Sequence, residues 1–358
     1  MPNPPTTIRD VAREAGVAVG TVSRVLNGSG PVSPATAERV RAVMARLGFA
    51  PSEAGRALRT GASRAVGVLV PTISNPIFAR SMEGIEAVLR ARGYAALLMS
   101  TRYDPAAEAG ALATLVARGV DGVIATLARA DAAPATPVPT VLLYNRPDGT
   151  DPGAALATVD SRGAVRDATR RLIALGHRRI AFLGGHFAAS DRSAARAEGY
   201  RAAMEEAGLP AWPPEEVAFE DEGPAFDAAI ARLLDRLSRP TALICSNDLL
   251  AMATVAALRR AGLAVPRDVA VIGFDGMPAA RLAHPPLSTI RQPARSLGRA
   301  AAALLLDMID GAPARRVVMP TEFLDGGTLA CPPEAMAPLR AGAAPRPNPA
   351  TLIDRTDP

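Results

Sequence analysis

Histidine and cysteine, the side chains that most often carry nucleophilic or metal chemistry, are few in this sequence and far apart. The histidines are His177, His186 and His284, and the cysteines are Cys245 and Cys331. Their spacing gives neither a Ser-His-Asp order nor a metal-ligand cluster, and it excludes a disulfide scaffold. His177 follows a glycine at the end of a helix, where we expect a structural role. The sequence therefore predicts no catalytic centre, no metal site and no cofactor.

Arginine supplies all 40 basic residues of the 358-residue chain, and its excess is concentrated near the N-terminus. Residues 1–62 contain eight arginines and four acidic residues, whereas the remainder contains 32 arginines and 31 acidic residues. Positive charge gathered at one end of a chain indicates a polyanionic partner. A solvated helical bundle can carry as much charge. The elements that position these arginines must therefore distinguish a segment that binds a polyanion from such a bundle.

Three short amphipathic helices are predicted in the basic segment. Thr7 and Asp10 have the spacing of a capping box, and apolar residues in 8–15 recur at i, i+3, i+4 and i+7. Gly16 ends this helix and a second begins almost at once, while Ser33 caps a third that has proline at its first position. Two helices joined by a tight glycine turn are typical of a helix-turn-helix unit. Periodicity alone leaves a DNA-binding unit and a generic three-helix bundle equally open.

The residues themselves distinguish these two alternatives. Segments 7–12 (TIRDVA), 15–17 (AGV) and 21–27 (TVSRVLN) closely resemble, in order and spacing, the DNA-binding headpiece of the LacI family. Residues 32–33 and 47–49 continue the match. The resemblance implies a sequence-specific transcription regulator, most consistently a repressor, whose partner is double-stranded operator DNA.

The same resemblance implies a recognition helix that begins near Val19 and enters the major groove by its N-terminal end. It puts Val19, Gly20 and Arg24 at base edges, where Arg24 can donate two hydrogen bonds to guanine and Val19 can touch a thymine methyl group. Gly20 has no side chain to contribute. Ala18 stands where relatives usually have a serine cap, so a cap and a phosphate contact are missing. The other expected DNA contacts are Thr7, Thr21, Ser23, Asn27 and Ser33.

Residues 52–59 match the family's hinge helix, which in relatives folds on DNA and inserts a leucine into the minor groove. Leu58 occupies the matching position, and apolar wedges of this kind kink DNA. A linker leucine is the alternative for Leu58 taken alone. Arg59 is expected to meet phosphate. We therefore expect a headpiece at 1–50 and a hinge at 51–63.

From residue 65 onward, short apolar strands alternate with amphipathic helices. This alternation predicts parallel α/β sheets, and the length suits two subdomains with a ligand between them at the carboxyl ends of the strands. Strands are predicted at 65–70, 95–99, 122–125, 140–143, 180–183, 242–245 and 269–274, and helices at 77–92, 162–175, 192–207 and 247–261.

The LacI resemblance extends through this region to about residue 330. Its motifs include 119–122 (GVDG), 175–180 (LGHRRI), 246–248 (SND), 272–275 (IGFD) and 286–292 (PLSTIRQ). It implies an all-α helix-turn-helix headpiece followed by a periplasmic-binding-protein-like core of two Rossmann-like parallel-sheet subdomains. The core is expected at 64–330, with one subdomain formed by 64–159 and 292–319 and the other by 160–291 and 320–330.

The resemblance also places a small-molecule effector between the subdomains. Arginine, asparagine and aspartate converging in one cleft can bond vicinal hydroxyl groups, which suits a sugar or sugar derivative. The arginine pair could equally hold a carboxylate, so a sugar acid is included, and a nucleobase stays open. Phe219 or Glu220 falls where many relatives place an aromatic slab, and His186 is a further candidate contact. The expected effector-binding residues are Ser74, Phe78, Asn145, Arg192, Arg196, Asn247, Asp275 and Gln292.

The remaining expectations concern assembly and location. Residues 331–358 are rich in proline and alanine and contain no leucine heptad, so we predict a disordered tail and, by default, a homodimer that matches a two-fold operator. No apolar run reaches the roughly 18–20 residues that span a bilayer, and the first residues have no signal-peptide pattern. We therefore expect no membrane association and a cytoplasmic location. A periplasmic solute-binding protein would lack the headpiece, and an α/β enzyme would need a catalytic constellation.

Overall fold

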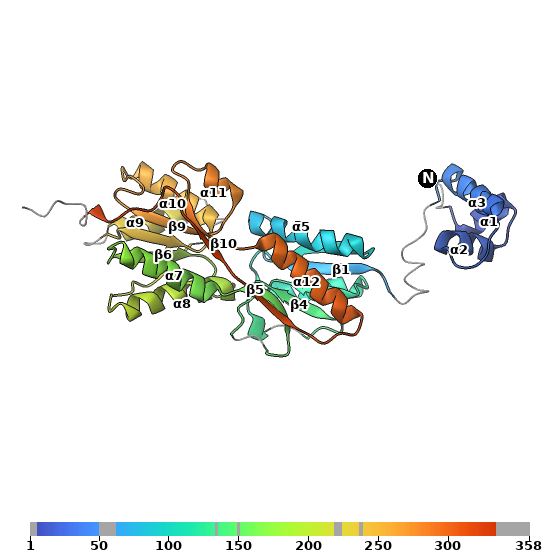
Figure 1. Ribbon diagram of the computed structural model, residues 1–358, viewed down its shortest axis with the longest axis horizontal. Coiled ribbons are helices and arrows are strands. Elements are labelled where there is room, and N and C mark those ends of the chain that lie inside the picture. The colour runs from blue at the N-terminus through green and yellow to red at the C-terminus, as the bar shows by residue number, and fades with distance from the viewer. Residues whose placement is uncertain are drawn as a thin grey trace, which may run out of the picture. The chain divides into compact units, whose positions relative to one another are not determined.

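The computed structural model describes residues 6–49, 62–132, 135–148, 151–217, 224–235 and 239–333. The chain forms two compact units. The first contains three N-terminal helices, and the second contains two α/β lobes (Figure 1). Among the described residues, no helix is long and apolar enough to cross a membrane. Residues 51–61 of the predicted hinge and residues 334–358 of the predicted tail lie outside the described residues.

The first unit consists of α1 (Ile8–Ala15), α2 (Val19–Asn27) and α3 (Pro34–Arg46). Its first helix begins with the predicted capping box, and its third begins at the predicted serine cap followed by proline. The three helices bury a small core in which Val11, Val22 and Val40 are fully inaccessible. Thus the first unit holds together through its own apolar cluster.

Gly16 makes the turn between α1 and α2. Its φ of +63° lies in the left-handed region, which glycine adopts without a steric penalty. The backbone N–H of Val17 then donates to the carbonyl oxygen of Ala12, 3.0 Å away, closing the end of α1. This compact turn lets α2 start only a few residues later, as a helix-turn-helix requires.

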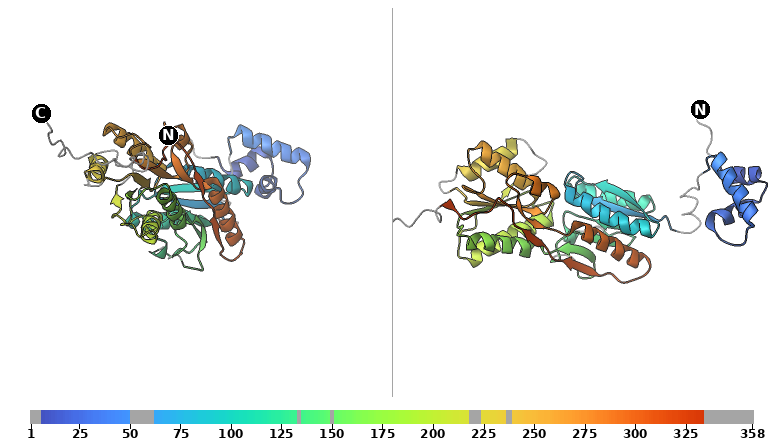
Figure 2. Two further views of the ribbon diagram at one scale, coloured as in Figure 1. Left: turned by 60° about the vertical axis from the view of Figure 1, so that its left-hand side comes forward. Right: turned by 45° about the horizontal axis from the view of Figure 1, so that its top comes forward.

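The first lobe of the second unit is a six-stranded sheet in the order β11-β5-β4-β3-β1-β2. Helices α5 (Pro76–Ala91) and α12 (Ala294–Ile309) pack against each other on this sheet, and α6 (Pro105–Ala117) contacts β2. Figure 2 shows α5 and α12 side by side. The strands are β1 (Ala65–Val70), β2 (Ala95–Ser100), β3 (Gly122–Ala125), β4 (Thr140–Leu143), β5 (Ala155–Val159) and β11 (Arg316–Met319).

Two glycines allow the close contact between α5 and α12. A Cβ atom added at Gly84 would lie 2.1 Å from the carbonyl oxygen of Arg295, and one added at Gly298 would lie 2.1 Å from that of Ser81. Both obstructing atoms belong to helix backbone, which cannot move aside as the end of a side chain can. The helices therefore meet backbone to backbone, and the first lobe has no space for a larger residue at either position.

The second lobe is a six-stranded sheet in the order β12-β10-β9-β8-β6-β7. Its β12 pairs antiparallel with β10, so the sheet has one antiparallel edge strand beside its parallel strands. The strands are β6 (Ile180–Gly184), β7 (Glu215–Glu216), β8 (Ala242–Cys245), β9 (Ala270–Asp275), β10 (Ser288–Arg291) and β12 (Glu322–Leu324). The helices are α7 (Ser161–Ala174), α8 (Asp191–Glu206), α9 (Pro224–Leu234), α10 (Asp248–Arg260) and α11 (Pro278–Leu282), and the first lobe also carries the short helix η1 (Ala130–Ala132).

The chain passes between the two lobes after β5, after β10 and after β11. Each lobe therefore combines segments that are distant in the sequence. Residues that follow β1 and β4 in the first lobe face residues that follow β6, β8 and β9 in the second lobe across one shared space. Parallel strands bring their carboxyl ends to one edge of a sheet, and such an edge is where open α/β sheets bind ligands.

Candidate functional site

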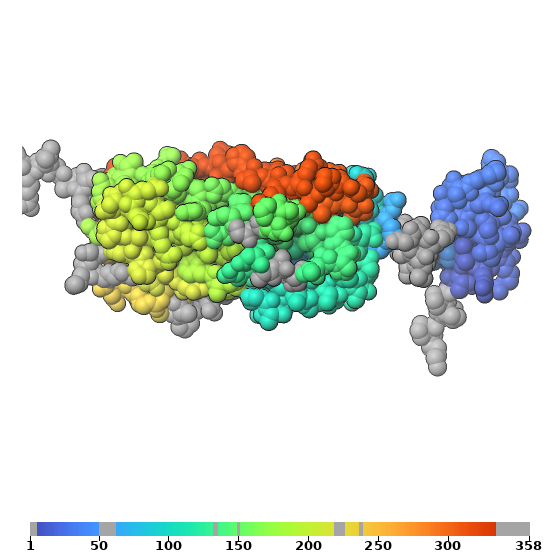
Figure 3. Space-filling model, turned by 90° about the horizontal axis from the view of Figure 1, so that it is seen from below, coloured from blue at the N-terminus to red at the C-terminus, as the bar shows by residue number. Residues whose placement is uncertain are grey.

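A cavity of about 40 Å³ lies between the lobes at the carboxyl ends of the strands. Seen from below in Figure 3, the surfaces of the two lobes meet without a wide opening. The first lobe contributes loop residues and the start of α5, and the second contributes loop residues and the first turns of α8. The cavity is lined by Asn75, Ile77, Phe78, Tyr103, Tyr144, Gly185, His186, Ser190, Arg192, Ser193, Arg196, Ser246, Asn247, Asp275 and Gln292.

Asp275 ends β9 and carries the carboxylate of the cavity. Its Oδ2 accepts a hydrogen bond from Asn75 Nδ2 at 3.1 Å, and its Oδ1 accepts one from Gln292 Nε2 at 2.8 Å. Only 3% of the residue is exposed, and this burial raises the carboxyl pKa, while the nearby Arg196 guanidinium lowers it. Asp275 has a φ of +113°, a strained conformation for a residue with a side chain. Strain of this kind is found where a fold fixes a functional group in one orientation.

Arg196 supplies positive charge from α8. Its guanidinium lies over the Phe274 ring, 3.6 Å from the ring centroid, and donates a hydrogen bond to the carbonyl oxygen of Ser246. Burial lowers the pKa of Arg196 to about 10, against the opposing effect of Asp275. Arg196 therefore remains a cation near neutral pH, and the Asp275 carboxylate acts to balance its charge.

Arg192, one turn earlier on α8, connects the two lobes. Its Nη1 donates to the carbonyl oxygen of Leu127 at 2.9 Å and lies 3.7 Å from Oδ1 of Asp191. The residue is 6% exposed, so its charge is removed from bulk water. Its contacts with Leu127 and Asp191 fix the orientation of this buried guanidinium. A ligand can complete its hydrogen bonds.

Several buried polar atoms around the cavity lack a hydrogen-bond partner within the part of the chain that the structure describes. They include two donors, Nη2 of Arg192 and Nε of Arg196, and one acceptor, Oε1 of Gln292. The hydroxyl oxygen of Ser193 is in the same situation. A buried polar group without a partner costs about 1–3 kcal/mol, and most buried polar groups are paired. The cavity therefore offers both donors and acceptors to a polar small molecule.

Aromatic rings surround these polar groups. Phe78 and Tyr144 meet edge to face, with centroids 5.9 Å apart. Tyr103 from the first lobe stacks on His186 from the second, with centroids 4.2 Å apart and planes inclined by 10°. The rings add flat apolar surface on which a ligand's carbon skeleton can pack.

In the first unit, α2 presents the side chains expected to read DNA. Val22 is fully buried and fixes the helix, whereas Val19, Gly20 and Arg24 are exposed. Arg24 forms no ion pair with any described residue, so its guanidinium can bind another partner. As predicted, Ala18 gives α2 an N-terminus without a side-chain cap.

The expected phosphate contacts on this unit already have local partners. Thr7 Oγ1 donates to the Asp10 carboxylate at 2.6 Å, and Ser33 Oγ donates to Thr36 Oγ1 at 2.8 Å. Asn27 Nδ2 donates to Ser23 Oγ at 3.2 Å. Thr21, also on α2, is half-buried. Any phosphate bound here must share or replace these bonds, whereas the exposed Arg24 on α2 needs no exchange of an ion pair with a described residue.

Segments of both units match known protein families. Residues 7–52 match the model for bacterial regulatory proteins of the lacI family, and residues 169–329 match the periplasmic binding protein-like domain. Over 311 residues the chain is 33% identical to the HTH-type transcriptional repressor PurR of Photobacterium profundum, covering 85% of this chain and 92% of that protein. The chain belongs to the LacI family. It is a DNA-binding transcriptional repressor and not an enzyme.

Solved LacI-family structures share the fold. The lac repressor dimer bound to operator and the anti-inducer ONPF has a TM-score of 0.80 at 26% identity, covering 91% of this chain and 99% of that one. The complex of the transcriptional regulator CelR with cellobiose has a TM-score of 0.66 at 32% identity, covering 90% and 99%. The predicted fold class, a helix-turn-helix headpiece before a core of two parallel-sheet subdomains, is thereby confirmed.

Within this LacI-family repressor, the structure brings together most of the effector residues expected from the sequence and leaves two apart. Ser74 is exposed and does not line the cavity. Asn145 is fully buried beside it, but its Nδ2 donates to Asp191 Oδ2 at 2.8 Å and its Oδ1 accepts from the backbone N–H of Leu127 at 3.1 Å. Asn145 therefore joins the lobes, and both hydrogens of its Nδ2 are already donated to protein groups. The residues brought together are Phe78, Arg192, Arg196, Asn247, Asp275 and Gln292.

Other lining residues lie beside the expected ones or elsewhere in the chain. Asn75 lies between the expected Ser74 and Phe78, in the loop after β1, and caps α5. Tyr103, which no sequence signal indicates, lines the cavity and has a backbone φ of +58°. His186 was left open and lies in the lining, whereas His177 is buried and bonded to Thr241 and to the carbonyl oxygen of Ala330.

Four residues that the sequence analysis singled out cannot be placed in either site. Leu58, Arg59, Phe219 and Glu220 lie outside the described residues. Among the residues that are described, no group of three or more histidine, cysteine or acidic side chains could hold a metal ion.

Proposed function

We propose that this LacI-family repressor binds a palindromic operator as a homodimer and that a sugar or sugar derivative, bound between its lobes, switches its affinity for DNA. The observation that carries the effector assignment is the convergence of Asp275, Arg192 and Arg196 with unpaired buried donors and acceptors in one interlobe cavity. The DNA assignment rests on α2 and the family to which the chain belongs.

A polyhydroxylated ligand suits this chemistry. Each hydroxyl group can donate to a carboxylate or amide oxygen and accept from a guanidinium N–H. Asp275 and Gln292 offer the oxygen atoms, and Arg192 and Arg196 offer the N–H groups. The similarity to a regulator solved with cellobiose supports the same ligand class.

A sugar acid is the second candidate, and a specific observation favours it. Two buried guanidinium groups each have a nitrogen without a partner, Nη2 of Arg192 and Nε of Arg196. A carboxylate would accept hydrogen bonds from both, and guanidinium–carboxylate hydrogen bonds are among the strongest in proteins. Asp191 and Asp275 already lie near the two guanidinium groups, so the unpaired nitrogens favour the acid and charge balance does not.

The cavity volume has a consequence for either candidate. About 40 Å³ accommodates one or two water molecules, whereas ligand sites in proteins occupy roughly 300–1,000 Å³. The lobes or their lining side chains must therefore separate to admit the effector. The contacts between the lobes change as the ligand enters. In this proposal, the ligand thereby shifts the equilibrium between the lobe arrangement that binds the operator and the one that does not.

The DNA-binding half of the proposal places α2 in the major groove, with Arg24 on guanine and Val19 against a thymine methyl group. Leu58 is assigned to the minor groove at the operator centre, and Arg59 to phosphate. A wedge at that position favours a flexible pyrimidine–purine step in the operator.

A ligand panel on the full-length protein tests the proposal. We expect a saturable rise in melting temperature with one member of a set of neutral sugars, sugar acids and nucleobases, including ribose, cellobiose and gluconate. Arg192→Gln then separates the two candidates, because it removes an ion pair from an acid but only a hydrogen bond from a neutral sugar. A stabilising nucleobase, with no response to any sugar or sugar acid, would contradict the assigned ligand class.

A further inference from the structure

A second cavity of about 740 Å³ lies beside the connection from β10 to α12. Its walls come from both lobes, with α5 and the start of α12 on one side and α11 and β10 on the other. It shares Ile77, Asp275 and Gln292 with the effector cavity, so the two spaces adjoin at these residues. The volume is within the range of small-molecule sites.

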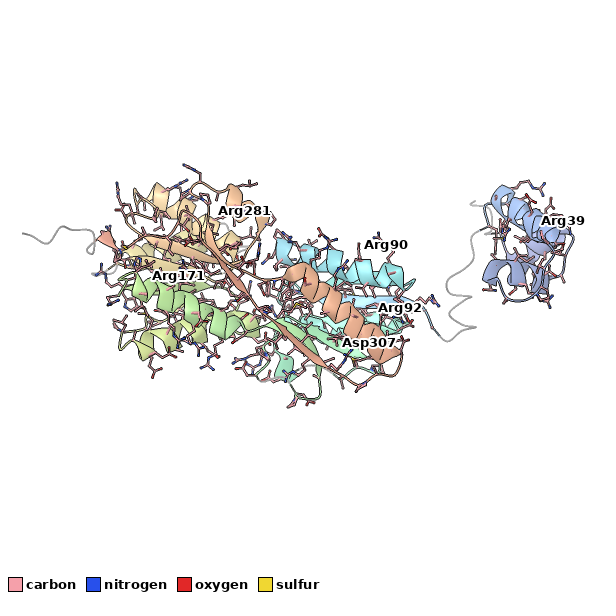
Figure 4. All side chains as sticks on the ribbon, in the orientation of Figure 1. Arg39, Arg90, Arg92, Arg171, Arg281 and Asp307 are labelled. Atoms are coloured by element: carbon pink, nitrogen blue, oxygen red, sulfur yellow. The ribbon has the colours of Figure 1, made fainter. Side chains whose placement is uncertain are left out.

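Four arginine side chains line this second cavity. Arg80 on α5 and Arg295 on α12 belong to the first lobe, while Arg281 on α11 and Arg291 on β10 belong to the second. Figure 4 shows Arg281 on α11 in the second lobe. We call this space the arginine groove.

Protein carboxylates balance only part of the charge of the arginine groove. Arg291 pairs with Glu322. For the other three arginines, no ion-pair partner is present among the residues that the structure describes. Asp275 is the one acidic residue of the lining and is nearly inaccessible, so the groove keeps an excess of positive charge. Guanidinium groups gathered in this way repel one another and attract anions.

The N-terminus of α12 adds to the positive potential. This 16-residue helix has no side-chain cap at Pro293 and no acidic residue in its first turn. Its first three residues, 294–296, line the arginine groove. The N-terminal end of a helix carries a partial positive charge and unpaired N–H groups, which favour an anion.

We propose that the arginine groove binds a small anion with two or more negative charges, of the pyrophosphate or sugar-phosphate type, at a site separate from the effector cavity. Arg281, Arg291 and Arg295 are exposed and Arg80 is half-buried, so salt screens these charges and a singly charged ion would gain little. A multiply charged anion contacts guanidinium groups of both lobes at once. It thereby relieves their mutual repulsion and favours the lobe arrangement in which they approach each other.

Calorimetry on the full-length protein with pyrophosphate, at ionic strength held constant with sodium chloride, tests the proposal. We expect saturable binding at one site per chain. Replacement of Arg80, Arg281 or Arg295 singly by glutamine should weaken it by about tenfold, the effect of losing one charge-assisted hydrogen bond. The triple replacement should abolish it. Arg299→Gln is the matched control, because Arg299 lies one turn further along α12, is exposed and is outside the groove, so affinity should not change.

The single variants keep the test decisive if the triple variant does not fold. Absence of saturable pyrophosphate binding would overturn the proposal, as would unchanged affinity in all of the groove variants. Loss of binding in Arg192→Gln, with affinity retained in the groove variants, would place the anion in the effector cavity and would also overturn it. The pyrophosphate titrations test the arginine groove independently of the effector assignment, because they contain no sugar.

Discussion

Asn75 and Asp275 are 200 positions apart in the chain, and the side-chain amide of Asn75 donates a hydrogen bond to the Asp275 carboxylate over 3.1 Å. Asn75 belongs to the first lobe, where its Oδ1 also accepts from the backbone N–H of Ile77 to cap α5. Asp275 belongs to the second lobe. A ligand hydroxyl that displaces Asn75 from the carboxylate exchanges a bond between the lobes for a bond to the ligand. We therefore expect effector binding and lobe arrangement to be coupled through this contact.

Arg24 provides the prediction for DNA recognition. Arg24→Ala should lose discrimination at one symmetric pair of operator positions, at a cost of about 1–3 kcal/mol for the preferred guanine. The headpiece should remain folded because Arg24 is exposed and forms no ion pair within the described structure. Gel-shift titrations with single-base operator variants measure this. An unchanged ranking of those variants would remove Arg24 from base recognition.

Ala18 provides a stabilising prediction. It occupies the N-cap of α2 with extended backbone angles, φ −69° and ψ 150°, and contributes no side-chain bond. Serine adopts the same angles and can accept from an N–H of the first turn. Ala18→Ser should stabilise the helix by about 1 kcal/mol, seen as a higher melting temperature of the headpiece. An unchanged or lower value would mean that the added hydroxyl group does not reach the helix.

Gly84 provides a packing prediction with a matched control. Gly84→Ala places a methyl group 2.1 Å from the carbonyl oxygen of Arg295, so α5 and α12 must separate. We expect a loss of about 1–3 kcal/mol or more in the free energy of unfolding. Gly110→Ala, in α6 with no atom within 4 Å of the new Cβ, should instead stabilise by about 0.5–1 kcal/mol. Chemical denaturation of both variants checks the contrast. Equal effects would contradict the backbone contact.

Asp248 provides the pH prediction. It is fully buried, and burial, together with the neighbouring Asp275, raises its pKa to about 7 from an ordinary value of 3.8. Hydrogen bonds from Thr289 and from the backbone N–H of Met277 oppose that rise. Between pH 4 and 7 the folded state therefore binds more protons than the unfolded state. Stability should fall as the pH rises through this window, by up to about 1.4 kcal/mol per pH unit, and should level off above it.

Asp248→Asn is the variant that tests this origin, because asparagine is neutral at every pH. Urea unfolding between pH 4 and 8 should show a smaller decline in the variant than in the natural protein. Burial also raises the pKa of Glu108 and of Asp275, so a residual slope of the same sign should persist. A decline as steep as that of the natural protein would exclude Asp248 as its source.

Most of the fold could be predicted from sequence where apolar periodicity is strong. Strands expected at 65–70, 122–125, 140–143 and 242–245 match β1, β3, β4 and β8 residue for residue. The elements that periodicity does not indicate are those governed by tertiary contacts. Helix α12 is alanine-rich and packs through glycine, and β12 is a three-residue edge strand that exists only by pairing with β10. Their partners lie far away in the chain.

The sequence predicts that residues at the ends of strands form the candidate site. It does not predict which of their side chains are already bonded to other protein groups. Asp275 and Asn145 both follow strands, and only the hydrogen bonds show that Asn145 is committed to the contact between the lobes. Tyr103 lines the cavity and has a left-handed backbone conformation, which a tyrosine in the sequence does not indicate. Partners and backbone angles of this kind depend on the folded lobes.

The most direct test of the account is the operator affinity of Asp275→Asn measured against increasing concentrations of the effector found in the ligand panel. Asparagine keeps the size of the side chain and can bond to Asn75 and Gln292, but it removes the carboxylate charge. The account predicts operator affinity within about twofold of the natural protein without effector, and a switching midpoint at least tenfold higher, as expected for the loss of one or more charge-assisted bonds. An unchanged midpoint in a well-folded Asp275→Asn protein would contradict it.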